Sequence, residues 1–160
     1  MLFATHLLIG ALVARNRFPV AWVVAGAALP DLVDKPLAMV GLVPTYHSVA
    51  HSALFAGVLG AGWLAARRYE AATAPGAVTA VGVGWVTHLV ADAVHISING
   101  RPENVVFLLW PLVRSWNSIG LGPGSFALQY LWTPSFYVEV AIWLLAGALL
   151  LRDGPPATDA

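Results

Sequence analysis

Cysteine is absent from this chain of 160 residues, and charged side chains are scarce. The lack of cysteine excludes a disulfide framework, a thiolate nucleophile and zinc sites built on cysteine. Only 10% of the residues are charged, whereas soluble domains carry about 25%. Eight basic and eight acidic residues cancel, so no overall positive field indicates a nucleic-acid partner.

What the chain has instead is apolar sequence. Hydrophobic residues make up 59% of it, and its mean hydropathy is +0.75. The last three of its apolar runs meet or nearly meet the length of about 20 residues that a helix needs to cross a bilayer. We therefore predict an all-α fold, a polytopic integral membrane bundle of about five helices in one domain, residues 1–152. The five runs lie at roughly 1–14, 18–30, 48–66, 75–98 and 135–151.

The basic residues predict how this bundle is oriented. If the segments alternate in direction, Lys35, Arg101 and Arg114 lie on one side. Because positively charged loops stay in the cytoplasm, the side with more arginines is expected to be cytoplasmic. The chain is then a multi-pass protein of the cell membrane with its amino terminus outside. The arginines of the cytoplasmic side are Arg15, Arg17, Arg67, Arg68 and Arg152.

Histidine and aspartate gather at the opposite, extracytoplasmic end, where the alternation predicts a polar site. Such groups are costly at membrane depth and are functional candidates for that reason. We expect His47 and His51, at the start of the third helix, to share one helix face, and likewise His88 and Asp92, because each pair is four residues apart. The predicted metal ligands are His6, Asp31, Asp34, His47, His51, His88 and Asp92.

Imidazole and carboxylate together are typical ligands of zinc, manganese and iron at hydrolytic centres. Seven candidates exceed one tetrahedral shell, so we expect one or two divalent ions, with zinc as the first choice. Asp34 or Asp92 is the candidate general base, as the carboxylate left over from ligation. His95 is interpreted as an interior hydrogen-bonding group. Glu139 is left open between a site role and a structural hydrogen bond.

Other functions use the same residue types. Aspartate and histidine also line proton and metal-ion pathways, so membrane transport is the alternative to hydrolysis. A conduit needs polar residues that continue to the cytoplasmic side, and Glu139 is the only candidate for this role in the sequence. Haem ligation by paired histidines would need none of the aspartates.

Residues 99–134 are too long for a structureless connection. They carry aromatic side chains that favour the membrane–water boundary, at Trp110, Trp116, Tyr130 and Trp132. We predict a loop with short helices that lies along the outer interface, partly covers the site, and offers Arg101 and Arg114 to an anionic headgroup. Membrane lipids and a lipid or phosphoester substrate are the expected partners. The tail, residues 153–160, is expected to be flexible.

Five short motifs in this order resemble the YdjM family of membrane-bound, metal-dependent hydrolases. They are THLLIGA (5–11), LPDLVDKP (29–36), HSVAHS (47–52), THLVADAV (87–94) and LLWPL (108–112), so the resemblance covers roughly residues 1–112. It implies a ligand set of His6, Asp31, His51, His88 and Asp92.

Two positions depart from the family pattern. The segment that ends at His51 is one residue shorter than in the family, which makes the match of His47 looser. Asp34 follows Asp31 by three residues instead of two. The family is distantly similar to zinc-dependent phospholipase C and P1-type nucleases, which are all-helical phosphoesterases, and this similarity implies a phosphoester substrate by analogy.

Overall fold

The computed structural model describes residues 1–68, 74–117, 121 and 123–153. Every regular element in these ranges is a helix, which confirms the all-α prediction. Most of the predicted tail, residues 154–160, lies outside the described residues. The elements are α1 (Phe3–Ala14), α2 (Val20–Met39), α3 (Ala53–Arg68), α4 (Ala74–Ile98), the 3₁₀-helix η1 (Pro102–Leu109), α5 (Pro123–Tyr130) and α6 (Pro134–Asp153).

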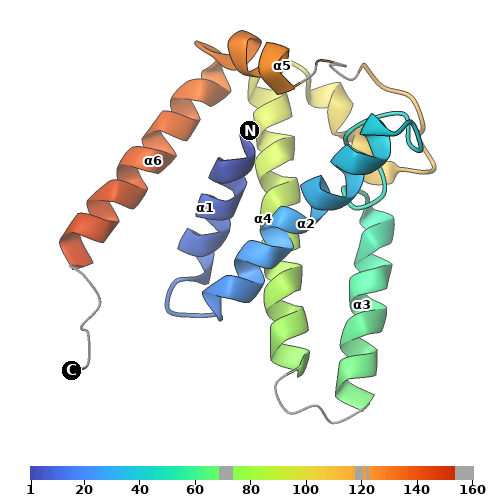
Figure 1. The fold of residues 1–160 in the computed structure, drawn as a ribbon, viewed down its shortest axis with the longest axis vertical. Coiled ribbons are helices and arrows are strands. Elements are labelled where there is room, and N and C mark those ends of the chain that lie inside the picture. The colour runs from blue at the N-terminus through green and yellow to red at the C-terminus, as the bar shows by residue number, and fades with distance from the viewer. Residues whose placement is uncertain (69–73, 118–120, 122, 154–160) are drawn as a thin grey trace.

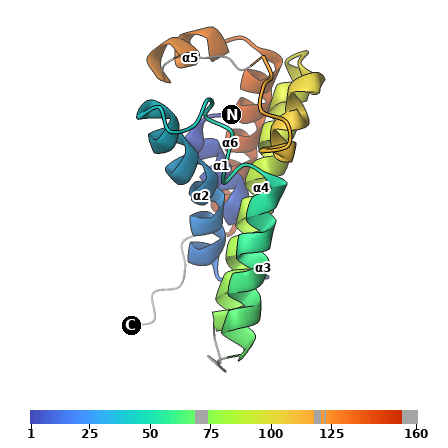
Figure 2. The ribbon, with the colours of Figure 1, turned by 90° about the vertical axis from the view of Figure 1, so that its right-hand side faces the viewer.

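Helix α4 is the axis of the fold. It contacts α1, α2, α3, α6 and η1, and in Figure 1 it runs through the middle of the molecule, with α1 on one side, α3 on the other, and α2 crossing it obliquely. Helix α5 lies across one end of the bundle in both views (Figures 1 and 2). The five predicted apolar runs correspond to α1, α2, α3, α4 and α6, while η1 and α5 belong to the segment 99–134.

Helices α2 and α4 approach closely because glycine occupies their crossing point. A Cβ atom added at Gly26 would collide with the backbone of Val81, and one added at Gly84 would collide with the Val23 carbonyl. Small residues allow two helix backbones to come this near. This crossing sets the spacing at which the polar residues of α2 and α4 meet further along.

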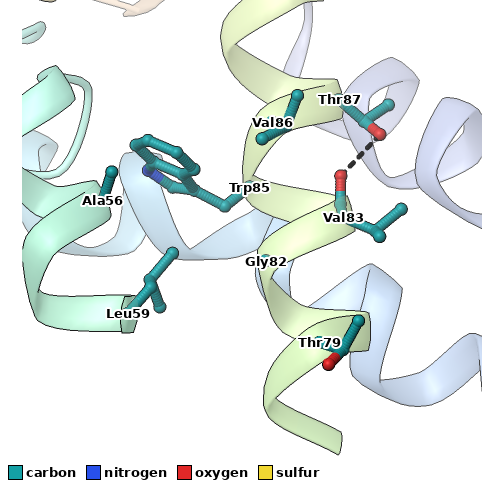
Figure 3. A pocket seen from close by; sticks show the side chains of 8 residues that line it. All are labelled: Ala56, Leu59, Thr79, Gly82, Val83, Trp85, Val86 and Thr87. Carbon is teal, nitrogen blue, oxygen red and sulfur yellow. Dashed lines mark hydrogen bonds between the residues drawn. The ribbon is translucent and has the colours of Figure 1, made fainter. Parts of the chain in front are cut away.

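Helix α3 packs on the other side of α4 through Trp85. Figure 3 shows the indole extending from α4 toward Ala56 and Leu59 of α3. The Trp85 Nε1–H donates to the Ala50 carbonyl at 2.7 Å, which ties the segment before α3 to α4. Beside the indole, an open apolar groove runs between the surfaces of the two helices.

The predicted end of the second helix near Pro30 is wrong. Helix α2 continues through Pro30 and Pro36 to Met39, so Asp31 and Asp34 lie inside it. A proline removes one hydrogen bond, and neighbouring helices can hold such a segment helical. Helix α2 packs against α4 here, and the His88 Nδ1–H of α4 donates to the Ala27 carbonyl at 2.6 Å, just before Pro30.

The prediction that His47 and His51 share a helix face is also wrong. Both precede α3, in an irregular segment between Val40 and Ser52. The physical reason is Asp34, whose carboxylate accepts hydrogen bonds from the backbone N–H groups of this segment. Side-chain acceptors of this kind compete with helix formation. The two imidazoles still meet, with ring centroids 4.6 Å apart.

Two helices in the described ranges are long and apolar enough to cross a membrane, over Gly76–Ile98 and Pro134–Arg152. They correspond to α4 and α6. Helix α1 is apolar but shorter, and α3 has 16 residues. The crossing of all five segments therefore stays a prediction.

Candidate metal centre

All seven predicted ligands meet at one end of the bundle, although they come from α1, α2, α4 and the segment before α3. Most are fully buried, and His47 is the most exposed, at 32% of its side chain. Six of them form three overlapping groups whose ligand atoms lie within 4.8 Å of one another. The groups are His6, His88 and Asp92; Asp31, His51 and His88; and His47, His51 and Asp92. These buried groups can hold a metal ion.

Three imidazoles are oriented by oxygen acceptors behind them. The Nδ1–H of His6 donates to the Leu2 carbonyl at 3.1 Å, and that of His88 donates to the Ala27 carbonyl at 2.6 Å. A carbonyl can only accept, so these contacts place the proton on Nδ1. The His51 Nδ1–H donates to Asp34 Oδ2 at 2.7 Å. Metal-binding histidines in proteins are held in this way through their second nitrogen.

The opposite nitrogens converge. His51 Nε2 and His88 Nε2 are 3.2 Å apart, and they lie 3.5 and 3.2 Å from Asp92 Oδ2. Zinc–ligand bonds of about 2.0–2.1 Å in a tetrahedron give ligand–ligand edges of about 3.3 Å. The three atoms therefore form a triangle with the size of one face of a zinc tetrahedron. Asp31 Oδ1 lies 3.6 Å from the first nitrogen and 3.9 Å from the second.

These contacts require a positive charge between the atoms. With Nδ1 protonated, neutral His6 has only a lone pair on Nε2, yet this nitrogen lies 2.9 Å from Asp92 Oδ1. The same holds for the 3.2 Å contact between His51 and His88. Two acceptors at such distances repel each other unless a proton or a metal cation lies between them. A proton on one imidazole of each contact, as on His51, satisfies these distances, and so would a metal cation, so the arrangement is compatible with either.

Asp92 is the central carboxylate. Its Oδ1 faces His6, and its Oδ2 also lies 3.4 Å from His47 Nε2, besides the contacts with His51 and His88. A carboxylate with its two oxygens directed at different sets of imidazoles can bridge two ions. This geometry is compatible with one or with two metals.

Asp34 lies outside the three ligand groups. Its fully buried carboxylate accepts from the backbone N–H groups of Ser48, Ala50 and His51, at 2.8, 3.0 and 3.1 Å, in addition to the His51 imidazole. Four donors occupy most of the lone pairs of a carboxylate. Asp34 therefore orients His51 and shapes the segment that carries it.

The negative charge at the site exceeds its fixed positive charge. Lys35 Nζ pairs with Asp31 Oδ2 at 2.6 Å. The α-amino group of Met1 lies 3.7 Å from Asp92 Oδ1, but burial lowers its pKa, which weakens it as a counter-charge. Burial also lowers the pKa of His51, but its contacts with Asp34 and Asp92 outweigh burial and raise this pKa to about 9. A proton on His51 thus partly balances the aspartates when no metal is bound.

Metal binding is expected to depend on pH, because a metal must displace the proton of His51. The raised pKa means that this proton stabilises the metal-free fold fully below pH 6.5, and that its contribution is lost as the pH rises through about 9. The apparent zinc affinity should increase by about tenfold per pH unit between pH 7 and 9. Chelator competition at several pH values measures this slope, and a flat profile would contradict displacement of a proton.

Two further buried residues lie beside the ligand groups. The Glu139 Oε1 accepts from the backbone N–H of Leu2 at 2.6 Å, so it ties α6 to the start of α1 by a structural hydrogen bond. His95 lines the cavity next to the site and lies 5.4 Å from the ring of Tyr130. Its Nδ1 has no hydrogen-bond partner in the described part of the chain, unlike the interior hydrogen bond that we predicted for it.

The sequence analysis did not identify the groups that contact the predicted ligands and orient them. The carbonyls of Leu2 and Ala27 orient two histidines, and main-chain acceptors leave no signal in residue type. The pairing of Lys35 with Asp31 could have been found from their spacing of four residues within a helix.

Comparison of the chain with protein-family models, curated proteins and solved structures gives no match. Its function is therefore argued from the geometry of the site.

Proposed function

We propose that this protein is an integral membrane, metal-dependent hydrolase that acts on a phosphoester or lipid-type substrate. The observation that carries the proposal is the triangle of His51 Nε2, His88 Nε2 and Asp92 Oδ2, with sides of 3.2 to 3.5 Å. Zinc is the preferred ion because the ligands are nitrogen and oxygen at tetrahedral spacing, with manganese or iron as alternatives. Membership of the YdjM family is part of the proposal, since its five matching residues all belong to the ligand groups.

The surface supports a location in the membrane. Large apolar side chains are exposed on several helices, including Leu64 of α3 at 64%, Val90 of α4 at 56% and Leu144 of α6 at 69%. Helices α1, α3 and α6 all direct their carboxyl ends toward the same end of the bundle (Figure 1), and basic residues lie at or directly after these ends. By the positive-inside rule, this arrangement supports a cluster on the extracytoplasmic side.

In such a site, different residues would bind the ion and orient its ligands. Asp92, His51 and His88 hold the ion, Asp34 fixes the imidazole of His51, and Asp31 adds an oxygen at the edge shared by the two histidines. When bound, the ion would supply an acidified water molecule as the nucleophile. We considered Asp34 as a general base, but its carboxylate already accepts four hydrogen bonds. We therefore assign Asp34 the role of orienting His51.

Transport is the less favoured function. Away from the cluster, toward the ends that carry the arginines, the bundle closes on an apolar core of Ala14, Val23 and Ala80, each fully buried, with Phe18 and Val83 against it. A conduit for ions would need polar groups there. Among the described residues, the groups of side chains that could hold a metal ion all belong to the cluster, and none lies at this core.

Proteoliposomes with zinc-loaded protein test the two functions in parallel. Release of nitrophenol from p-nitrophenyl and bis-p-nitrophenyl phosphate reports hydrolysis, and an entrapped zinc indicator reports transport. We expect hydrolysis that falls at least about 100-fold in Asp92→Asn, because removing one major catalytic contribution typically costs this much, and no zinc flux. Equal hydrolysis by the two proteins, or flux without hydrolysis, would refute the proposal.

A further inference from the structure

We propose that Arg101 forms an anion subsite beside the metal centre, and that the cavity between them binds the phosphate of an alkyl phosphate whose chain lies against Trp116 and Phe126. This inference rests on the proposed function and narrows its substrate to a phosphate that carries an apolar chain.

A cavity of about 330 Å³ adjoins the ligand groups. Ligand pockets usually start at about 300 Å³, so the space suits a small ligand. His6, His47, Asp31 and Asp92 of the ligand groups line it, and so does Arg101. A bound molecule can therefore touch both the metal ligands and this guanidinium.

The guanidinium of Arg101 contributes a positive charge to the wall of the cavity. Arg101 directly precedes η1, and its backbone N–H donates to the Ile96 carbonyl at 3.2 Å. In the described ranges, no carboxylate lies within ion-pair distance of its guanidinium. The other basic side chain of the lining, Lys35, is already paired with Asp31. A guanidinium presents a planar array of donors that suits phosphate oxygens.

The remaining lining of the cavity is mostly apolar. Trp116 and Phe126 contribute aromatic rings, and Met39, Ile96 and Leu121 contribute aliphatic surface. Free phosphate would leave this surface in contact with water, whereas an alkyl chain would cover it and gain free energy by burial. The combination of metal ligands, a guanidinium without a carboxylate partner among the described residues, and apolar walls therefore fits an amphiphilic phosphate better than inorganic phosphate.

Arg114 is the matched control. Like Arg101 it lies in the segment 99–134, but it does not line the cavity. It is exposed, and its Nε–H donates to the Pro111 carbonyl at 3.1 Å. The sequence analysis proposed both arginines as partners of an anionic headgroup, but only Arg101 lines the cavity.

Calorimetric titration of the zinc-loaded, detergent-solubilised protein tests the subsite with inorganic phosphate and with hexylphosphonate, an alkyl phosphate analogue whose carbon–phosphorus bond a phosphoester hydrolase does not cleave. Hexylphosphonate should bind wild type at least tenfold more tightly than inorganic phosphate. Arg101→Gln should weaken both ligands at least tenfold, while Arg114→Gln should change neither. Trp116→Ala should remove the advantage of hexylphosphonate and leave inorganic phosphate unchanged. If that variant fails to fold, Phe126→Ala serves the same purpose.

Zinc content, measured on every sample by elemental mass spectrometry, separates this inference from the proposed function. Zinc retained together with equal phosphate binding by Arg101→Gln and Arg114→Gln would overturn the subsite alone. If wild type binds hexylphosphonate and inorganic phosphate with equal affinity, the proposal that an alkyl chain lies against Trp116 and Phe126 would be overturned, and free phosphate would be identified as the ligand. Zinc that does not stay bound to wild type would overturn the proposed function and this inference together.

Discussion

Asp92→Asn should lower the zinc affinity at least about 100-fold, more than the 10–100-fold loss typical when a group behind a metal ligand is removed. The substitution keeps the size of the side chain but removes the negative charge that faces four imidazoles. It also replaces one oxygen by an NH₂ donor, which cannot bind a cation. Chelator competition on the purified protein gives the affinity.

Glu103→Gln is the control for this experiment. Glu103 is an exposed carboxylate in the first turn of η1 and lies outside the ligand groups, so neutralising it should leave the zinc affinity unchanged. Equal affinities of Asp92→Asn and wild type would show that the central carboxylate does not hold the metal, and our assignment of the ligands would be wrong.

Asp34→Ala should damage both the fold and the site, although Asp34 is outside the ligand groups. Three backbone N–H groups lose their acceptor, and each buried, unpaired donor costs about 1–3 kcal/mol. The His51 imidazole also loses the partner that fixes its orientation. We expect destabilisation by several kcal/mol and a zinc affinity lower by about 10–100-fold.

Asp34→Asn separates the two effects. The amide oxygen still accepts from the backbone of the segment before α3, so most of the stability should return. The negative charge opposite His51 is gone, so the zinc affinity should stay below that of wild type. Thermal unfolding followed by circular dichroism, with zinc affinity measured on the same samples, compares the two variants. Wild-type zinc affinity in both variants would contradict the orienting role of Asp34.

The sequence predicted two of the long helices well. Helices α4 and α6 agree with the apolar runs 75–98 and 135–151 to within two residues, because each run is long and carries a single acidic residue, Asp92 or Glu139. The convergence of the seven histidines and aspartates was also predictable. When successive apolar segments alternate in direction, the end of one segment lies beside the start of the next. Residues near those ends therefore meet even where the local secondary structure differs from the prediction.

Local structure around Asp34 was not predictable from pattern. Two prolines suggested that α2 ends near Pro30, but the helix, which packs against α4, continues to Met39. The four-residue spacing of His47 and His51 suggested a helix, but the carboxylate of Asp34 binds the backbone there and prevents one. In both places a long-range contact outweighed local preference, and a single sequence carries no record of such contacts.

X-ray absorption spectroscopy at the zinc edge, on protein reloaded with zinc and dialysed, tests the central claim most directly. The account predicts retained zinc with only nitrogen and oxygen neighbours at about 2.0–2.1 Å, and outer-shell scattering from at least two imidazoles, those of His51 and His88. Zinc lost on dialysis, or a spectrum without imidazole scattering, would contradict a metal centre at this end of the bundle.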